Sequence, residues 1–196
     1  AASAGADVPA ILGLGDTDSG TVYLVSSRVD GQPLDGCDDD LITPAVLASL
    51  WSQILDLRRA RLAHRNLALT NILIGDDESA RILDFDRAEI SAGDRDLNRD
   101  VAELLVGLSA KIGVPTTVTS AVETLGSEVV AATLPQLQPL ALPPEIRSLA
   151  QRHKGLLDEL SVAVRDQTGA EEVELEQLQR VRPKTILMIV AGSLAF

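Results

Sequence analysis

The chain has 196 residues, a formal net charge of −12, 45% apolar residues and only 2% aromatic residues. This length is enough for one domain with a real core, or for a domain with an appendage. The acidic balance disfavours non-specific nucleic-acid binding because phosphates would be repelled, and we expect no nucleic-acid partner. The single cysteine, Cys37, excludes a disulfide within the chain.

The N-terminal part of the sequence predicts β-structure. Residues 10–14 and the β-prone run 21–26 flank a turn-like stretch of Asp, Thr, Ser and Gly, and this order is typical of a hairpin. Residues 29–34 follow as an extended connection. The chain begins at Ala1 rather than at Met, which is typical of a fragment or a processed product. We therefore expect the remainder of a larger polypeptide among its partners.

Helical periodicity begins after residue 43. Thr43 is a good N-cap, Pro44 suits the first helical position, and apolar residues keep helical spacing to residue 62. Two short strands are predicted around a Gly-Asp-Asp-Glu loop, over residues 71–74 and 81–83. Further helices are predicted over residues 100–108, 117–134, 144–165 and 170–181. The fold class is therefore expected to be α+β and mainly helical.

An uncharged apolar run, residues 186–196, ends the sequence after the basic residues Arg182 and Lys184. A membrane span needs about 20 apolar residues, and this run stops where the sequence stops. The basic flank suits the cytoplasmic edge of a membrane helix. We favour a truncated transmembrane helix from residue 185, which would place the chain at the cytoplasmic face of the cell membrane. The alternative is a C-terminal helix packed on the core.

The most informative pattern is His-Arg-Asn at residues 64–66 with Asn71 behind it, followed by Asp-Phe-Asp at residues 84–86. It resembles two loops of the protein-kinase-like fold, H-R-D-x-x-x-x-N and D-F-G. The resemblance implies a kinase-like C-lobe in which Asn71 and Asp84 hold Mg²⁺ against the phosphates of ATP, with His64 structural. The alternative is an ordinary helix–loop–hairpin, with Asn71 as a turn residue and Asp84 as a strand-end cap.

Asn66 stands where that family has its catalytic Asp. An amide nitrogen has no available lone pair and an amide oxygen is far too weakly basic, so Asn66 cannot act as a general base. General acid–base help contributes about 10²–10⁴-fold to a reaction. Its loss would leave slow phosphoryl transfer, or nucleotide binding without turnover.

Two flanking segments extend the resemblance. Residues 23–34 are similar to the last N-lobe strand and the hinge, which implies that backbone groups of Ser27 and Val29 face adenine. Asp100 resembles the buried Asp that braces the catalytic loop, and a plain helix N-cap remains an equal alternative for it.

The sequence also departs from the family. No glycine-rich loop is complete, and all the lysines follow the catalytic loop: Lys111, Lys154 and Lys184. The phosphate-contacting lysine of the N-lobe therefore has no counterpart here. We expect this chain to bind Mg²⁺ and ATP only weakly.

The resemblance divides the chain into an N-lobe remnant with the hinge (1–36), a kinase-like C-lobe (37–165), a juxtamembrane connector (166–184) and a truncated transmembrane helix (185–196). The whole arrangement resembles that of actinobacterial kinase-like proteins fused to a lysylphosphatidylglycerol synthase/flippase-type membrane domain. The leading hypothesis is a degenerate kinase-like (pseudokinase) regulatory or nucleotide-sensing domain. The alternatives are an active ATP-dependent phosphotransferase for a small or lipid-linked acceptor, and a structural interaction module that binds no nucleotide.

Overall fold

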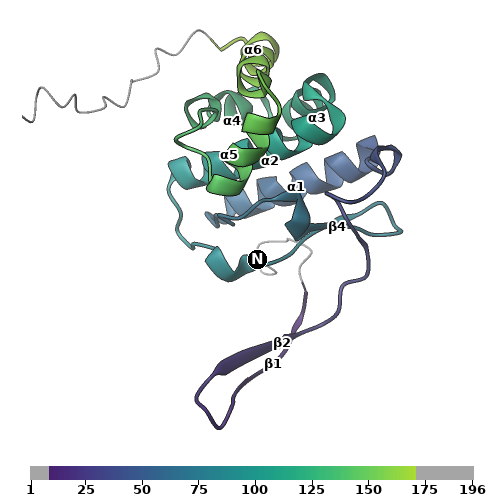
Figure 1. Ribbon diagram of the computed structural model, residues 1–196, viewed down its shortest axis with the longest axis vertical. Helices are drawn as coiled ribbons and strands as arrows, with labels where there is room; N and C mark the ends of the chain where they lie inside the picture. Colours follow the sequence, from purple (N-terminus) through teal and green to yellow (C-terminus); the bar gives the residue numbers. More distant parts are fainter. Residues whose placement is uncertain (1–8, 171–196) are drawn as a thin grey trace, which may run out of the picture.

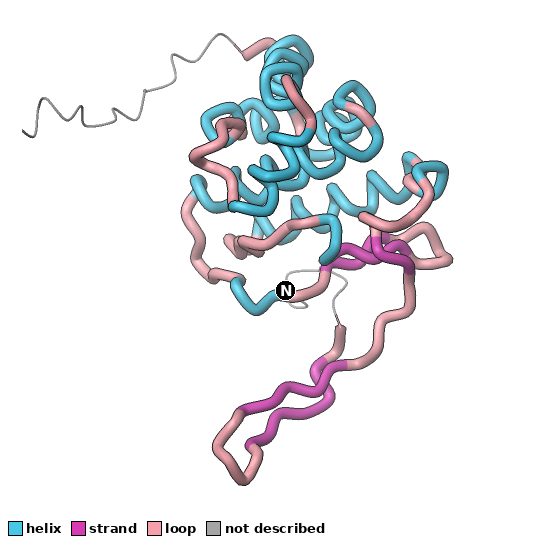
Figure 2. Tube along the Cα trace, in the orientation of Figure 1, coloured by secondary structure: helices cyan, strands magenta, loops and turns pink. Residues whose placement is uncertain are grey.

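Six helices and two small antiparallel sheets make up residues 9–170, the part of the chain that this computed structural model describes (Figures 1 and 2). The predicted fold class, α+β and mainly helical, is confirmed. The helices are α1 (Pro44–Arg59), α2 (Asp94–Ile112), α3 (Val114–Leu125), α4 (Ser127–Ala131), α5 (Pro144–Arg152) and α6 (Leu156–Thr168). Helix α2 contacts α3, α5 and α6 and forms the centre of the helical body.

Helix α1 begins as its sequence predicts. The Thr43 hydroxyl accepts the Val46 N–H at 3.3 Å, and Pro44 takes the first helical position. One side of α1 packs on α3, where Trp51 is fully buried and donates its indole N–H to Ser120 Oγ at 2.9 Å. The other side faces β5, where Ser49 Oγ accepts the Ala80 N–H at 3.1 Å. Helix α1 therefore joins the helical body to the smaller sheet (Figure 1).

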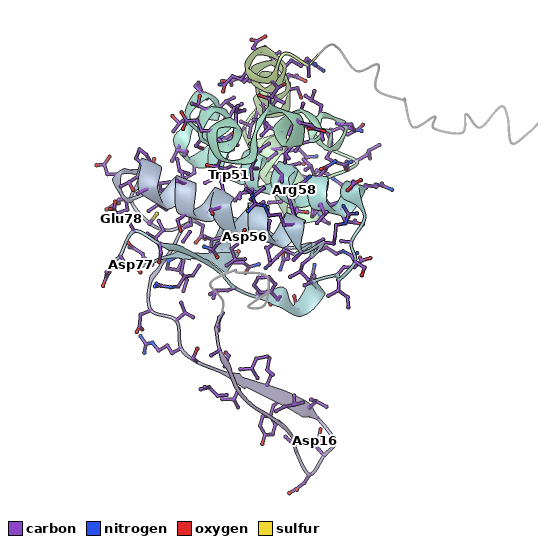
Figure 3. All side chains as sticks on the ribbon, turned by 180° about the vertical axis from the view of Figure 1, so that it is seen from behind. Asp16, Trp51, Asp56, Arg58, Asp77 and Glu78 are labelled. Atoms are coloured by element: carbon purple, nitrogen blue, oxygen red, sulfur yellow. The ribbon has the colours of Figure 1, made fainter. Side chains whose placement is uncertain are left out.

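The smaller sheet has the order β3–β4–β5, from β3 (Gln32–Pro33), β4 (Ile72–Ile74) and β5 (Ala80–Ile82). The β4–β5 hairpin confirms the two predicted strands, with Asp77 and Glu78 in its turn (Figure 3). Residues 29–34 were expected only as an extended connection, but Gln32 and Pro33 pair with Ile74 and Leu73. This pairing brings the segment after the first hairpin alongside β4, the strand that follows Asn71.

The first hairpin, β1 (Ile11–Asp16) and β2 (Val22–Ser26), confirms the predicted pairing of the N-terminal part. Its strands pair only with each other within residues 9–170, and Asp16 lies near its tip, away from the helical body (Figures 1 and 3). Residues 27–31 connect it to β3. The hairpin consequently exposes most of its large apolar side chains.

Two predicted helices are each divided by a glycine, so the prediction of continuous helices over 117–134 and 144–165 is wrong. Gly126 separates α3 from α4 with φ of 86°, and Gly155 separates α5 from α6 with φ of 83°. Both values lie in the left-handed region, which glycine enters without the steric clash of a Cβ. Apolar periodicity runs through both breaks and therefore did not reveal them.

Helix α2 begins at Asp94, six residues before the predicted start at Asp100, because Gly93 supplies the extended N-cap. Asp100 lies in the second turn of the helix and is 4% exposed. The alternative interpretation of Asp100 as a helix N-cap is therefore wrong.

The predicted helix over 170–181 and the predicted membrane helix over 185–196 lie outside the described residues. No helix within residues 9–170 is long and apolar enough to cross a membrane.

Candidate functional site

Two carboxylates of α2 accept hydrogen bonds from backbone N–H groups of residues 64–67. The Asp100 carboxylate accepts the His64 N–H at 2.5 Å and the Arg65 N–H at 2.8 Å. Glu103, three residues along the same helix, accepts the Leu67 N–H at 3.1 Å. Arg65 has φ of 65°, a left-handed conformation that a non-glycine residue adopts only where its surroundings fix it. We call Asp100 and Glu103 the carboxylate clamp.

His64 is fully buried beneath the same loop. Its Nε2 lies 2.8 Å from the carbonyl oxygen of Leu83, so this nitrogen carries the proton and donates it. The ring packs edge-on against Phe85 with 4.5 Å between centroids. Burial lowers the pKa of His64, so the ring is neutral near pH 7. These contacts make His64 a link between the loop and the segment that carries Asp84.

Three polar residues, Asn66, Asn71 and Asp84, are linked by hydrogen bonds next to the clamped loop. The Asn66 amide nitrogen donates to Asp84 Oδ2 at 3.2 Å, and the Asn71 amide nitrogen donates to the Asn66 carbonyl oxygen at 2.9 Å. The Leu83 N–H donates to the Asn71 carbonyl oxygen at 2.8 Å, which keeps the two segments side by side. Residues 66, 71 and 84 thus form one cluster, which we call the Asn–Asp cluster.

Asp84 follows β5 with φ of 63° and ψ of 61°. This left-handed conformation costs a non-glycine residue about 1–2 kcal/mol. Strained backbone of this kind persists where packing over-determines it and concentrates at functional sites. The carboxylate is exposed to solvent, and the backbone bend turns it toward Asn66 rather than along the strand.

The cluster offers a donor set suited to Mg²⁺. Asp84 contributes carboxylate oxygens and Asn71 contributes Oδ1, since its nitrogen is committed to Asn66. Magnesium prefers oxygen ligands and commonly takes one or two protein carboxylates, with water and phosphate oxygens completing its shell. Within residues 9–170 no three His, Cys, Asp or Glu side chains gather as a metal-binding group. The cluster itself could offer a metal ion one carboxylate and one amide oxygen.

Ser27, one of the two residues predicted to face adenine, bonds to Ala10 through two of its groups. The Ser27 N–H donates to the Ala10 carbonyl at 2.8 Å, and Ser27 Oγ accepts the Ala10 N–H at 2.9 Å. Both groups close the end of the first hairpin, so the Ser27 N–H is not available to an adenine ring. Val29 lies on the connection toward β3, half-buried, and no contact joins it to the Asn–Asp cluster among the described residues.

Two residues of the site were missed in the sequence. Glu103 completes the carboxylate clamp, and Glu89 pairs with Arg65 at 2.7 Å while its backbone bridges Ala63. The available signal for Glu103 was Asp-x-x-Glu spacing inside an apolar helix, which puts two carboxylates on one face. Burial raises the pKa of Asp100 to about 6 and that of Glu103 to about 7.

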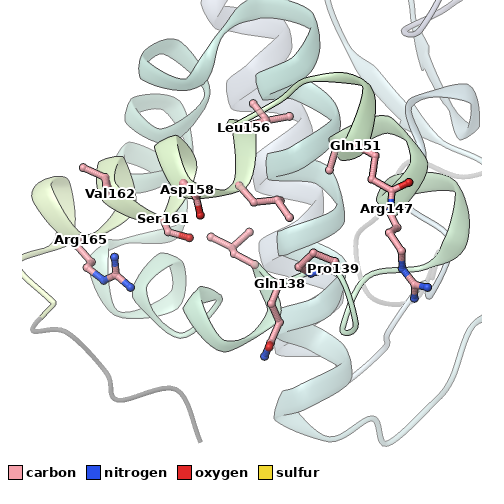
Figure 4. Close-up of a pocket in the computed structure, with 13 residues that line it drawn as sticks. Gln138, Pro139, Arg147, Gln151, Leu156, Asp158, Ser161, Val162 and Arg165 are labelled. Atoms are coloured by element: carbon pink, nitrogen blue, oxygen red, sulfur yellow. The ribbon is translucent and has the colours of Figure 1, made fainter. Parts of the chain in front are cut away.

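Two of the cavities of the described chain are lined by residues other than Asn66, Asn71 and Asp84. A cavity of about 510 Å³ opens between α5, α6 and the loop before α5, lined by residues such as Gln138, Arg147 and Arg165 (Figure 4). A second cavity, of about 300 Å³, lies beside residues 68–70 and is lined by Lys111 and Arg152 as well. Within the Asn–Asp cluster, Asp84 is exposed, and Asn66 and Asn71 are half-buried.

Comparisons with known proteins leave the family open. No family model matches the chain. One curated relative, an uncharacterized protein of Dictyostelium discoideum, is 29% identical over 98 residues, which cover 50% of this chain. The chain spans about a tenth of that protein's length, since the match covers 10% of it.

Proposed function

We propose that this chain contains the C-lobe of a degenerate kinase-like domain, a pseudokinase that senses nucleotide as the regulatory part of a larger, membrane-attached protein. The contact between Asn66 and Asp84 at 3.2 Å is the main support. It places an uncharged amide, at the position of the catalytic base, against the carboxylate proposed to bind metal.

Each residue of the cluster has a distinct task in this proposal. Bound Mg²⁺ would neutralise phosphate charge. Asn71 and Asp84 would supply its protein oxygen ligands, and Asn66 would orient the nucleotide side of the site through its amide without taking a proton. The carboxylate clamp would fix the loop that carries Asn66. Phosphoryl transfer depends mostly on positioning and charge neutralisation, so this set can bind nucleotide while lacking a base.

A transfer assay with γ-labelled ATP tests the absence of turnover. We expect the chain to transfer no more label than its Asp84→Asn variant. Robust transfer that Asp84→Asn abolishes would overturn the pseudokinase and favour the active phosphotransferase, for which the small or lipid-linked acceptor would then be sought. Asp77→Asn is a matched control, because Asp77 is an exposed carboxylate in the neighbouring β4–β5 turn.

The first hairpin favours the structural interaction module as a second candidate. Its large apolar side chains are between 45% and 72% exposed: Ile11, Leu12, Leu14, Val22, Tyr23, Leu24 and Val25. An isolated two-stranded hairpin is marginal in water, and an exposed apolar patch of this kind marks an interaction surface. Calorimetry with Mg²⁺-ATP separates the two functions: heat of binding that Asp84→Asn removes supports the pseudokinase, and no binding supports a module without nucleotide.

Attachment to a membrane rests on the apolar run at the end of the sequence and on the resemblance to kinase-like proteins fused to membrane domains. Co-sedimentation of the chain with anionic lipid vesicles tests it. We expect binding that is lost when residues 185–196 are removed, whereas equal binding of both forms would contradict attachment through this segment.

A further inference from the structure

The two members of the carboxylate clamp differ in how their oxygens are used. Both oxygens of Asp100 accept a backbone N–H, one from His64 and one from Arg65. Glu103 accepts the Leu67 N–H through Oε2 only, and its Oε1 is buried without a hydrogen-bond partner within residues 9–170. Glu103 is 1% exposed. A buried carboxylate with an oxygen that lacks a partner is unfavourable while it is ionised.

The charges around Glu103 do not offset its ionisation. Asp100 lies one helical turn away, and Glu145 of α5 adds a second negative charge on the other side. Arg99 is the cation that favours the ionised form, but its guanidinium is paired with Asp96 at 3.4 Å. Burial is the largest influence on the pKa of Glu103 and Asp100 the next. Together they outweigh the Leu67 N–H bond, which favours the ionised form, and raise the pKa to about 7.

Groups that face Asp100 complete the electrostatic setting. The negative charge of Asp100 favours the charged form of Arg58 in α1. Arg58 Nη2 donates to Asn98 Oδ1 at 3.0 Å. Asp96 raises the pKa of Asp100 and Arg99 lowers it, while the two backbone N–H bonds favour its ionised form. Asp100 is therefore the member that ionises first as the pH rises, with its pKa of about 6.

We propose that Glu103 keeps a proton at and below neutral pH and that release of this proton loosens residues 64–67, so that the geometry of the Asn–Asp cluster is proton-sensitive. Ionised Glu103 puts a second negative charge beside Asp100 in a site closed to water. The Leu67 N–H bond favours the ionised form, but burial and the Asp100 charge outweigh it. An outward turn of Glu103 relieves both, and this turn breaks the bond between the Leu67 N–H and Oε2. The backbone around Asn66 is then held by Asp100 on its N-terminal side but no longer by Glu103 on its C-terminal side. The effect on nucleotide binding rests on the proposed function, whereas the anchoring of residues 64–67 does not.

The direction of the effect on stability follows from proton linkage. Glu103 has a pKa of about 7 in the folded chain, above its ordinary value of 4.5, so the folded state binds more protons between these two values. Stability therefore falls as the pH rises through this window and becomes level above it. The same sign applies to Asp100 between 3.8 and about 6.

Nuclear magnetic resonance of the nucleotide-free chain tests the proposal. The Leu67 amide resonance is followed from about pH 5 to about pH 9, a range that contains the shifted value and excludes ordinary carboxyls at its upper end. We expect the Leu67 amide proton to move upfield, the direction of a weakened hydrogen bond, with a midpoint near that of Glu103, about 7, and the Asn66 amide to titrate with the same midpoint. A Leu67 resonance that stays unchanged, or that moves downfield as a strengthened bond would make it, would overturn the proposal.

Two variants separate Glu103 from other titrating groups. Glu103→Gln is expected to abolish the Leu67 titration and to flatten the fall of the melting temperature over the same range. Glu159→Gln replaces an exposed glutamate of α6 and is expected to leave both unchanged. An identical Leu67 titration in Glu103→Gln would refute the assignment. Because no nucleotide is present, these results stand whether or not the chain binds ATP, and the wild-type titration remains decisive if Glu103→Gln fails to fold.

Discussion

Asp100 links two backbone amides of the loop to the central helix, so its replacement should lower the free energy of unfolding. In Asp100→Asn, one carboxylate oxygen becomes an amide group that cannot accept a backbone N–H. A buried N–H left without a partner costs about 1–3 kcal/mol. We expect the free energy of unfolding at neutral pH to fall by about 2 kcal/mol, measured by urea denaturation with Trp51 fluorescence.

Asp76→Asn is the matched control for this substitution. Asp76 is exposed in the β4–β5 turn, so its replacement should change the free energy of unfolding by less than about 0.5 kcal/mol. Equal effects of the two substitutions would show that Asp100 does not anchor the loop.

Individual residues of the site could be predicted where local spacing determines geometry. A short β-hairpin returns the chain to its starting edge, so Asn71 before β4 and Asp84 after β5 lie close together, and the sequence predicted that proximity. Glu103 could not be recognised as a site residue, because its role depends on how α2 packs beneath residues 64–67. The resemblance likewise could not show that Ala10 accepts the Ser27 N–H, and an adenine contact of the Ser27 carbonyl stays a prediction.

Among the elements, Gly155 shows why the helix boundaries were the weakest predictions. Helix α5 ends at Arg152, and Gly155, with φ of 83°, is the N-cap of α6, although apolar spacing continues on both sides. Periodicity reports which face is buried, whereas a break depends on a single backbone conformation. Thr43 and Pro44 were reliable because a cap and a fixed φ act within one turn.

Replacement of Gly155 by Ala tests this account of the α5–α6 junction. No heavy atom lies within 4 Å of a Cβ built at this position, so the effect comes from the backbone alone. We expect the free energy of unfolding to fall by about 1–2 kcal/mol. Gly36→Ala meets no neighbour either and has no left-handed backbone, so the same denaturation experiment should show little change for it. A neutral Gly155→Ala would mean that the junction can form a continuous helix.

For the whole molecule, the projecting hairpin predicts association. Its apolar side chains are exposed on a pair of strands that has no further strand partner within residues 9–170. Leu24→Glu should reduce concentration-dependent self-association and leave the melting temperature unchanged, since Leu24 is 59% exposed. Sedimentation velocity measures the first and a thermal melt the second.

Ile90→Glu serves as the control for the hairpin, because Ile90 is 80% exposed but isolated from this patch. If Leu24→Glu and Ile90→Glu alter association equally, the hairpin is not the surface responsible. The hairpin was predicted from its strand-prone runs and turn residues, whereas its exposure depends on its position away from the helical body.

Paramagnetic line broadening by Mn²⁺-ATP tests the central claim most directly, because it detects weak binding and locates the metal. We expect the amides of residues 66, 71 and 84 to broaden first as Mn²⁺-ATP is added, and Asp84→Asn to remove the effect while the remaining spectrum is preserved. Uniform broadening over the acidic surface, or broadening centred elsewhere and unchanged in Asp84→Asn, would contradict a nucleotide–metal site at the Asn–Asp cluster.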